Sequence, residues 1–136
     1  MVRLGLVISE FDKTSAVIPA MESAAERAVT EADAEIVERI RVPGSYDTPL
    51  AADRLARRED IDAVVVLGAI ITGDTDHDQV IAQAAATGLT SVSIDRDTPV
   101  ALGIIGPGMT EAEARDRSEY GATAVTSAIQ LANDST

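Results

Sequence analysis

The stretch Ile61-Asp-Ala-Val-Val-Val-Leu67 decides the fold of this chain of 136 residues. It is short, almost continuously apolar and rich in β-branched residues, which is typical of a strand buried on both faces of a parallel sheet. Helical patterns lie on either side of it, over 46–58 and over 77–86. A buried strand between two helices indicates an α/β fold.

The same alternation extends toward the N-terminus. Leu4-Gly-Leu-Val-Ile8 reads as a second buried strand, and the apolar residues of 17–29 recur at the 3.6-residue spacing of a helix. A more exposed strand is predicted over 34–42. The apolar residues expected on one face of that strand are Ile36, Ile40 and Val42.

The C-terminal half continues the pattern with less regular signals. We expect a loop over 68–76 and two further strands over 90–94 and 100–105. Gly106-Pro-Gly108 is predicted to end the second of these strands, and a long helix is expected over 110–132. The chain is therefore predicted to form one domain over 1–136, with a parallel sheet, helices on both faces, and 90–94 as a short extra strand.

The composition limits the classes of function. The formal net charge is −12, from 23 acidic and 11 basic side chains, which opposes binding to nucleic acid or to an anionic membrane. The absence of cysteine excludes disulfides, thiolate metal sites and cysteine nucleophiles. Neither a signal peptide nor a membrane-length apolar run is visible, so we expect a soluble cytoplasmic protein.

The basic side chains are ten arginines and a single lysine, Lys13. An acidic chain with almost no lysine is typical of a protein adapted to high salt, because carboxylates hold water and cations at the surface. Such a protein should unfold when salt is removed. The alternative is an ordinary acidic cytosolic protein.

Three scarce residues follow three successive strands: Phe11, Tyr46 and His77. Ligands of open α/β sheets bind at the carboxyl ends of the strands, so these side chains are expected to meet at one edge. Phe11 suits either stacking on a planar heterocycle or anchoring of its loop. In the turn that contains Tyr46, Ser45 and Asp47 suit either a polyhydroxylated ligand or helix capping.

The segment 68–78 contains the most candidate catalytic and binding residues. Asp74, Thr75 and Asp76 are natural cap residues, and they place His77 in the first turn of the next helix, where it can exchange protons near neutral pH. A metal site is less favoured, because adjacent residues at a helix start do not converge on one ion.

A glycine-rich run, Gly103-Ile-Ile-Gly-Pro-Gly108, precedes the last helix and is similar to a phosphate cradle. It lacks the Lys-Ser/Thr of a P-loop and the position of a dinucleotide fingerprint, so nucleotide binding is weakly supported. Arg117 suits a phosphate through its planar guanidinium, whereas Arg115 fits a solvated helix face better.

Four motifs in order, together covering nearly the whole chain, resemble one family. They are Phe11-Asp12, Val42-Pro-Gly-Ser-Tyr-Asp-Thr-Pro49, Gly68-Ala-Ile-Ile-Thr-Gly-Asp-Thr-Asp-His77 and Pro99-Val-Ala-Leu-Gly103. They are similar to motifs of the 6,7-dimethyl-8-ribityllumazine synthase family, and Gly106-Pro-Gly-Met-Thr110 resembles its archaeal branch.

The resemblance implies a three-layer α/β/α sandwich of the flavodoxin-like type, with a four-stranded parallel sheet. It implies a homopentamer, which in some members builds an icosahedral shell of sixty subunits. The reaction implied is condensation of 5-amino-6-(D-ribitylamino)uracil with 3,4-dihydroxy-2-butanone 4-phosphate in riboflavin biosynthesis. No cofactor or metal is implied.

The resemblance also implies roles for the substrate-contacting residues. Phe11 would stack on the pyrimidine, and Ser45, Tyr46 and Asp47 would hold the ribityl chain. The ring pocket would be lined by Ala69, Ile70 and Ile71.

The remaining implied roles concern the phosphate and the protons. Asp74 and Thr75 would bind the phosphate region, and His77 would move protons during imine formation and phosphate loss. Leu102 and Arg117 would come from the neighbouring subunit, with Arg117 gripping the phosphate.

Four positions depart from the family pattern: Asp12 for asparagine, Asp47 for glutamate, Leu102 for a phenylalanine of bacterial members and Tyr120 for a lysine of bacterial members. Three other readings remain. An archaeal riboflavin synthase paralogue shares the fold but not the histidine motif. A flavin- or lumazine-binding shell protein would not need His77, and a flavodoxin-like signalling module would want lysine at the strand ends.

Overall fold

The computed structural model describes residues 1–10, 16–71 and 76–134. Helices follow strands throughout, as the alternating pattern predicts. The elements in chain order are β1 (Arg3–Ser9), α1 (Val17–Glu31), β2 (Glu35–Val42), the 3-10 turn η1 (Ser45–Asp47), α2 (Thr48–Ala56), β3 (Ala63–Ile71), α3 (His77–Arg96), β4 (Val100–Met109), α4 (Glu111–Arg115) and α5 (Tyr120–Asn133).

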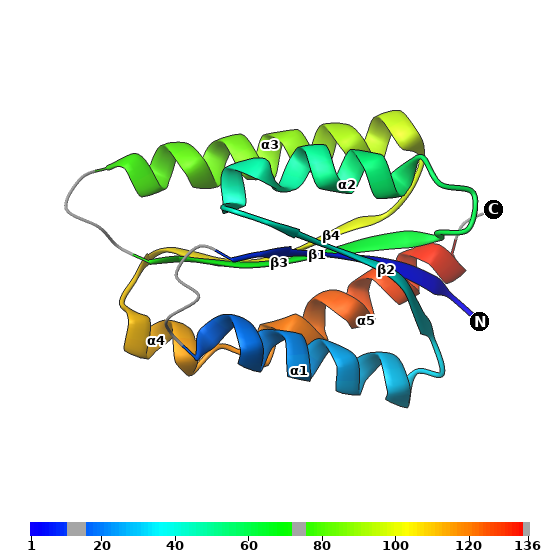
Figure 1. Ribbon diagram of the computed structural model, residues 1–136, viewed down its shortest axis with the longest axis horizontal. Helices are drawn as coiled ribbons and strands as arrows, with labels where there is room; N and C mark the ends of the chain where they lie inside the picture. The colour runs from blue at the N-terminus through cyan, green and yellow to red at the C-terminus, as the bar shows by residue number, and fades with distance from the viewer. Residues whose placement is uncertain (11–15, 72–75, 135–136) are drawn as a thin grey trace.

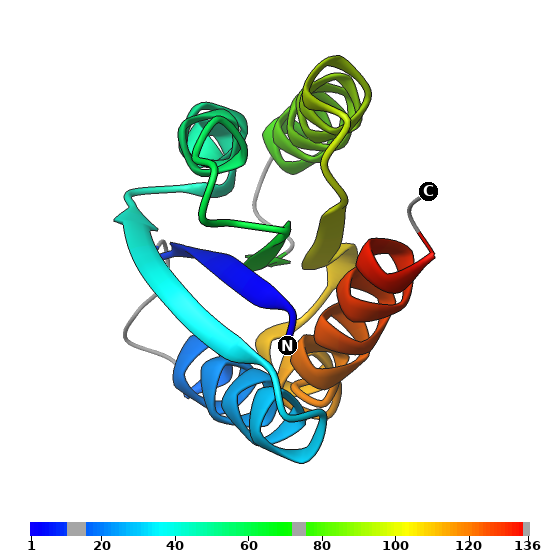
Figure 2. The same ribbon diagram turned by 90° about the vertical axis from the view of Figure 1, so that its right-hand side faces the viewer.

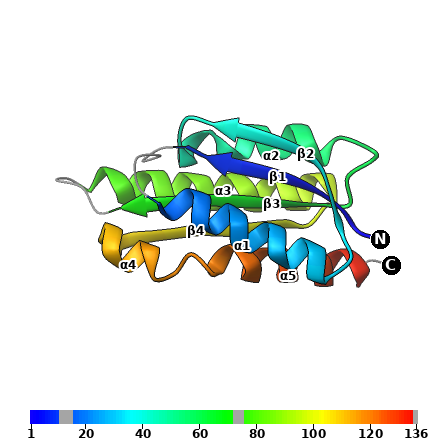
Figure 3. The ribbon, with the colours of Figure 1, turned by 60° about the horizontal axis from the view of Figure 1, so that its bottom comes forward.

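The four strands form one parallel sheet in the order β2-β1-β3-β4; Figure 3 shows them side by side. Helices α2 and α3 cover one face, and α1, α4 and α5 cover the other (Figures 1 and 2). This arrangement confirms the predicted three-layer α/β/α sandwich of flavodoxin-like type with a four-stranded parallel sheet. All four strands end at the same edge, on the left of Figure 1.

The core has two layers because side chains of a central strand alternate between the faces. On β3, Val64 and Val66 pack toward α2 and α3, while Val65 and Leu67 pack toward α1 and α5. All four are fully buried. The stretch that decides the fold is therefore the centre of the molecule, and it fixes which helices meet at the strand ends.

The predicted extra strand over 90–94 is wrong, because these residues belong to α3. Ala85, Leu89 and Val92 are buried at spacings of four and three, which is the spacing of one helix face. Ile94 is 74% exposed, so its β-branched side chain contributes little to the packing. Contact of this face with α2 and β4 outweighs the local preference of Thr, Val and Ile for strands.

The predicted loop over 68–76 is wrong for residues 68–71, which belong to β3, and the predicted end of β4 at 106–108 is wrong as well. Strand β3 continues to Ile71 and β4 to Met109. The pairing steps from Ala69 opposite Ile105 to Ile71 opposite Met109, so the glycine-rich run is an irregularity within the ladder. Gly106 has a φ of +91°, and a Cβ there would lie 2.1 Å from the backbone oxygen of Ile70. Only glycine permits this approach.

Two further expectations need correction. The register shifts between Leu4 and Gly5, so Ile36 packs with the α1 and α5 core whereas Ile40 packs with the α2 layer. An extra residue in a strand reverses the face of every residue after it. The long helix expected over 110–132 is divided into α4 and α5 by a turn over 116–119. That turn contains aspartate and serine, which form helices poorly.

Candidate active site

Two of the three scarce side chains lie in segments that follow the carboxyl ends of strands. Tyr46 lies in η1, directly after β2, and His77 is the first residue of α3, after β3. Helix α3 packs against η1, so the two segments are neighbours. Tyr46 and His77 each lie after the carboxyl end of a strand, as the chain order predicts. The predicted site residues Phe11, Asp74 and Thr75 lie outside the described residues.

The turn over 44–48 is closed by its own hydrogen bonds. The Gly44 amide donates to Oδ2 of Asp47 over 3.1 Å, and the Thr48 hydroxyl donates to the carbonyl oxygen of Ser45 over 2.7 Å. Ser45 is buried, whereas Tyr46 is 65% exposed. The capping role that the sequence left open for Asp47 is therefore present, and the same turn presents the Tyr46 ring outward.

Ser45 packs close to Gly68 of β3. A Cβ at Gly68 would lie 3.1 Å from the Ser45 Oγ and 3.2 Å from the Ser9 Cβ, so glycine leaves the room in which both serines fit. The Ser9 Oγ is buried and has no hydrogen-bond partner in the described part of the chain. The sequence analysis missed Ser9, although a polar residue directly after the apolar run 4–8 was a visible signal.

The end of β3 supplies one wall of a hollow. Ala69 is buried in the α1 and α5 core, whereas Ile70 faces α3. Ile70 and Leu102 line the same hollow of about 250 Å³, together with Gln79 and other residues of α3. Leu102 is 45% exposed on the edge strand β4. Ile71, the last residue of β3, is half-buried.

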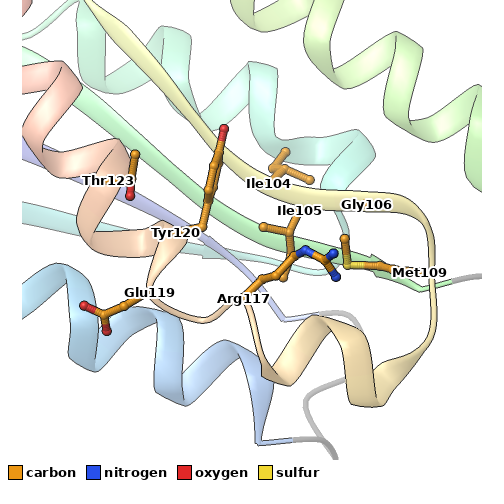
Figure 4. Close-up of a pocket in the computed structure, with 8 residues that line it drawn as sticks. All are labelled: Ile104, Ile105, Gly106, Met109, Arg117, Glu119, Tyr120 and Thr123. Carbon is orange, nitrogen blue, oxygen red and sulfur yellow. The ribbon is translucent and has the colours of Figure 1, made fainter.

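Arg117 occupies a second hollow, of about 510 Å³, beside β4 and the start of α5. In Figure 4 its side chain extends toward Met109 and Gly106, and the Tyr120 ring stands beside Ile104. Tyr120, which stands where bacterial members are expected to have a lysine, thus lines the hollow that contains Arg117. The guanidinium is the cationic group of this lining.

Other arginines are committed to ion pairs elsewhere on the surface. The Arg96 guanidinium donates to Asp53 over 2.8 Å, and this hydrogen bond lowers the pKa of that carboxyl. A hydrogen bond from Arg3 likewise lowers the pKa of Asp62. By contrast, the guanidinium of Arg117 lies 3.9 Å from its carboxylate neighbour. A loose pair of this kind leaves the cation able to bind another anion.

The described site residues therefore form separate groups. Ser45, Tyr46, Asp47 and His77 share the carboxyl edge, whereas Arg117 lies beside β4, the opposite edge strand from β2. A single chain does not place Arg117 beside the 45–47 turn.

Within residues 1–10, 16–71 and 76–134, no three histidine or carboxylate side chains are grouped as metal ligands. Over the same ranges, none of the helices combines the length and the apolar character needed to cross a bilayer.

The fold and the placement of polar side chains define a flavodoxin-like α/β/α protein with its candidate site at the carboxyl edge of the sheet. The family model described as 6,7-dimethyl-8-ribityllumazine synthase matches residues 1–135. The chain belongs to this family, and it is accordingly an enzyme of the transferase class that acts in riboflavin biosynthesis.

Similar curated proteins come from several archaea. The chain is 60% identical to the 6,7-dimethyl-8-ribityllumazine synthase of Halobacterium salinarum over 134 residues, covering 98% of this chain and 99% of that protein. It is 59% identical to that of Halorubrum lacusprofundi, covering 98% of each. It is 49% identical to that of Methanopyrus kandleri, covering 96% and 91%. Halobacterium and Halorubrum are halophiles, which agrees with the acidic, lysine-poor composition.

Proposed function

We propose that the enzyme condenses 5-amino-6-(D-ribitylamino)uracil with 3,4-dihydroxy-2-butanone 4-phosphate to give 6,7-dimethyl-8-ribityllumazine, phosphate and water. The observation that carries this proposal is the packing of the 45–47 turn against α3, the helix that begins at His77, at one sheet edge in a chain of this family. The two segments provide what the reaction needs: hydrogen-bonding groups for a polyol and a side chain that exchanges protons near neutral pH.

The uracil substrate is assigned to the edge formed by β3 and η1. Ser45, Tyr46 and Asp47 hold the ribityl chain, because this turn offers backbone groups, a hydroxyl and a carboxylate. The ring lies against the end of β3, at Ala69, Ile70 and Ile71, where the last residues of the strand offer backbone atoms. Phe11 is proposed to stack on the ring from the loop after β1.

Proton transfer is assigned to His77. The attack of the uracil amine on the ketone carbon needs a proton removed from nitrogen and one delivered to the departing water, and phosphate loss again needs proton transfer. His77 is exposed at the start of α3, where it can reach a bound substrate. Most of the acceleration comes from holding the two reactants together, because an amine and a ketone condense readily once they are aligned.

The phosphate is assigned to two segments. Asp74 and Thr75, which precede α3, bind it through main chain and hydroxyl, and Arg117 binds it through the guanidinium. Since Arg117 and Leu102 lie along the β4 edge, we propose that they serve the site of a neighbouring copy. The complete site then requires a homopentamer, alone or within a sixty-subunit icosahedral shell.

Exposed apolar side chains support self-association. Leu102 and Tyr120 are each 45% exposed beside β4, Leu131 is 54% exposed on α5, and Ile94 is 74% exposed on α3. These exposed apolar side chains are candidates for contacts between copies of the chain. We place the assembled enzyme in the cytoplasm, with its two small-molecule substrates as partners and with neither nucleic acid nor membrane.

The test is turnover at high salt with both substrates, followed through the absorbance or fluorescence of the lumazine. Product must form faster than in the spontaneous reaction without enzyme. A protein that binds the lumazine without forming it would be a shell protein, and one that converts lumazine into riboflavin would be a riboflavin synthase. Light scattering on the same sample gives the oligomeric state.

A further inference from the structure

Helix α4 is a short element built around one carboxylate. The Oε1 of Glu113 accepts hydrogen bonds from both the amide and the hydroxyl of Thr110, each over 3.2 Å. In return, the Thr110 Oγ accepts from the Glu113 amide over 3.2 Å. This reciprocal capping box fixes the Glu113 side chain at the start of the helix.

The second oxygen of Glu113 faces Arg117, one helical turn further along. The Nη1 of Arg117 donates to the Glu113 carbonyl oxygen over 3.3 Å and lies 3.9 Å from Oε2 of the same residue. Because Oε1 is taken by Thr110, Oε2 is the oxygen left to attract the guanidinium. The pair is half exposed, with 53% of each side chain accessible, so the attraction is weak and salt-dependent.

The carboxylate that lines the hollow itself, Glu119, is paired elsewhere. Glu119 forms an ion pair with Arg27 of α1, and Figure 4 shows it pointing away from Arg117. The rest of the lining is mostly apolar, including Ile104, Ile105 and Met109. In the described part of the chain, Glu113, which lies outside this lining, is the carboxylate paired with Arg117.

We propose that Glu113 is a positioning residue that sets how tightly Arg117 binds the substrate phosphate; this rests on the proposed function. The main-chain bond to Glu113 aims the guanidinium, while Oε2 competes with phosphate for it. When a phosphate binds, two short charge-assisted hydrogen bonds replace one loose ion pair. After phosphate is eliminated, Glu113 is the anion that takes Arg117 back and so favours release of the product.

The decisive variant is Glu113→Gln, because glutamine keeps the capping box and removes only the charge. We expect KM for the butanone phosphate and Ki for inorganic phosphate to fall about two- to fivefold, the range of an exposed ion pair. The KM for the uracil should not change. The difference should shrink as salt rises, because screening weakens the competing pair.

Two further variants distinguish a positioning role of Glu113 from a general effect of lost charge. Glu111→Gln removes the same charge from the same helix, at a carboxylate 4.0 Å from Arg115, and should leave both constants unchanged. Glu113→Ala removes the cap together with the charge, so α4 loosens and KM for the phosphate substrate should lie above that of Glu113→Gln.

The outcomes are distinct. Equal shifts of KM and Ki in Glu113→Gln and Glu111→Gln would mean that only the net charge matters. An unchanged Ki for phosphate in Glu113→Gln would mean that the Glu113–Arg117 pair does not affect phosphate binding. Either result overturns the proposal. If the wild type forms no lumazine above background, the proposed function fails, and calorimetry of inorganic phosphate binding to the same variants still tests Glu113.

Discussion

Substituting Gly68 by alanine is the sharpest test of the site geometry. The new Cβ would lie 3.1 Å from the Ser45 Oγ, 3.2 Å from the Ser9 Cβ and 3.4 Å from the Ile104 Cγ1. Each distance is tighter than, or at the lower limit of, ordinary van der Waals contact. Ser9 and Ile104 are held in buried strands, so most of the displacement must be taken by Ser45 and the turn above it.

The structure sets the size of the effect. Overpacking a well-packed site costs about 1–3 kcal/mol. Alanine also restricts the unfolded chain, which stabilises by about 0.5 kcal/mol where the backbone tolerates it. The net loss for Gly68→Ala is thus about 0.5–2.5 kcal/mol. At roughly 4 °C per kcal/mol for a domain of this length, Tm falls by about 2–10 °C.

Gly44→Ala is the matched control. Gly44 lies in the same turn with a φ of −151°, which any residue adopts, and its added Cβ would meet only Asp47 Oδ2, at 3.7 Å. It carries the same change in unfolded-state entropy without the clash, so its Tm should equal or exceed that of the wild type. The difference between the two variants measures the clash at Gly68.

The assay combines thermal unfolding at high salt with steady-state kinetics. Displacement of Ser45 should raise KM for the ribitylaminouracil about three- to tenfold, the loss expected for about one hydrogen bond. The KM for the butanone phosphate should stay at the wild-type value. If the Tm of Gly68→Ala equals that of Gly44→Ala, the packing argument is refuted. If Tm falls but both KM values stay at wild type, the role of the 45–47 turn in binding is refuted.

Four further predictions follow from the same structure. His77→Ala should slow turnover by about 10²-fold while leaving product binding intact, measured by single-turnover kinetics and lumazine fluorescence. Arg117→Ala should raise KM for the phosphorylated substrate about tenfold, with Arg115→Ala as the silent control; the reverse pattern would move the phosphate site to Arg115. Since Arg3 lowers the pKa of Asp62 in the folded protein, that pair stabilises above the unfolded pKa and its contribution is lost as the pH falls below about 4, so Asp62→Asn should flatten acid unfolding curves there. Lowering salt from about 2 M to about 0.05 M should unfold the protein, and an unchanged circular dichroism signal would contradict salt adaptation.

The fold was predictable where burial and local pattern agree. The runs at 4–8 and 61–67 are apolar because both faces of their strands are covered, so their sequence alone predicted two buried strands, and these prove to be the central pair of the sheet. At 90–94 the local pattern and the packing disagree: Val92 has a strand-forming side chain, but it completes a buried helix face with Leu89. A short window cannot reveal that contact, because it depends on the helix packed opposite.

Some residues of the candidate site could likewise be predicted from the sequence, and others could not. Tyr46 and His77 could be placed from chain order, since parallel strands end at one edge. Ser9 could not be recognised as buried against Ser45 until the register of β1, β3 and η1 was known. The pairing of Glu113 with Thr110 and Arg117 could have been predicted from the sequence, because Thr110-x-x-Glu113 is a capping-box pattern and Glu113 precedes Arg117 by four residues.

The distribution of charge explains how so acidic a chain can bind a phosphate. Arg117 pairs only loosely with Glu113 and lines a mostly apolar hollow, with about half of its side chain exposed. Arginines closely paired with carboxylates, at 2.6–3.2 Å, are Arg3, Arg39, Arg41, Arg57, Arg58 and Arg96. Those pairs neutralise carboxylates without creating positive potential. We propose that, in a chain of net charge −12, the weakly paired guanidinium of Arg117 supplies the local positive field that a dianionic substrate needs.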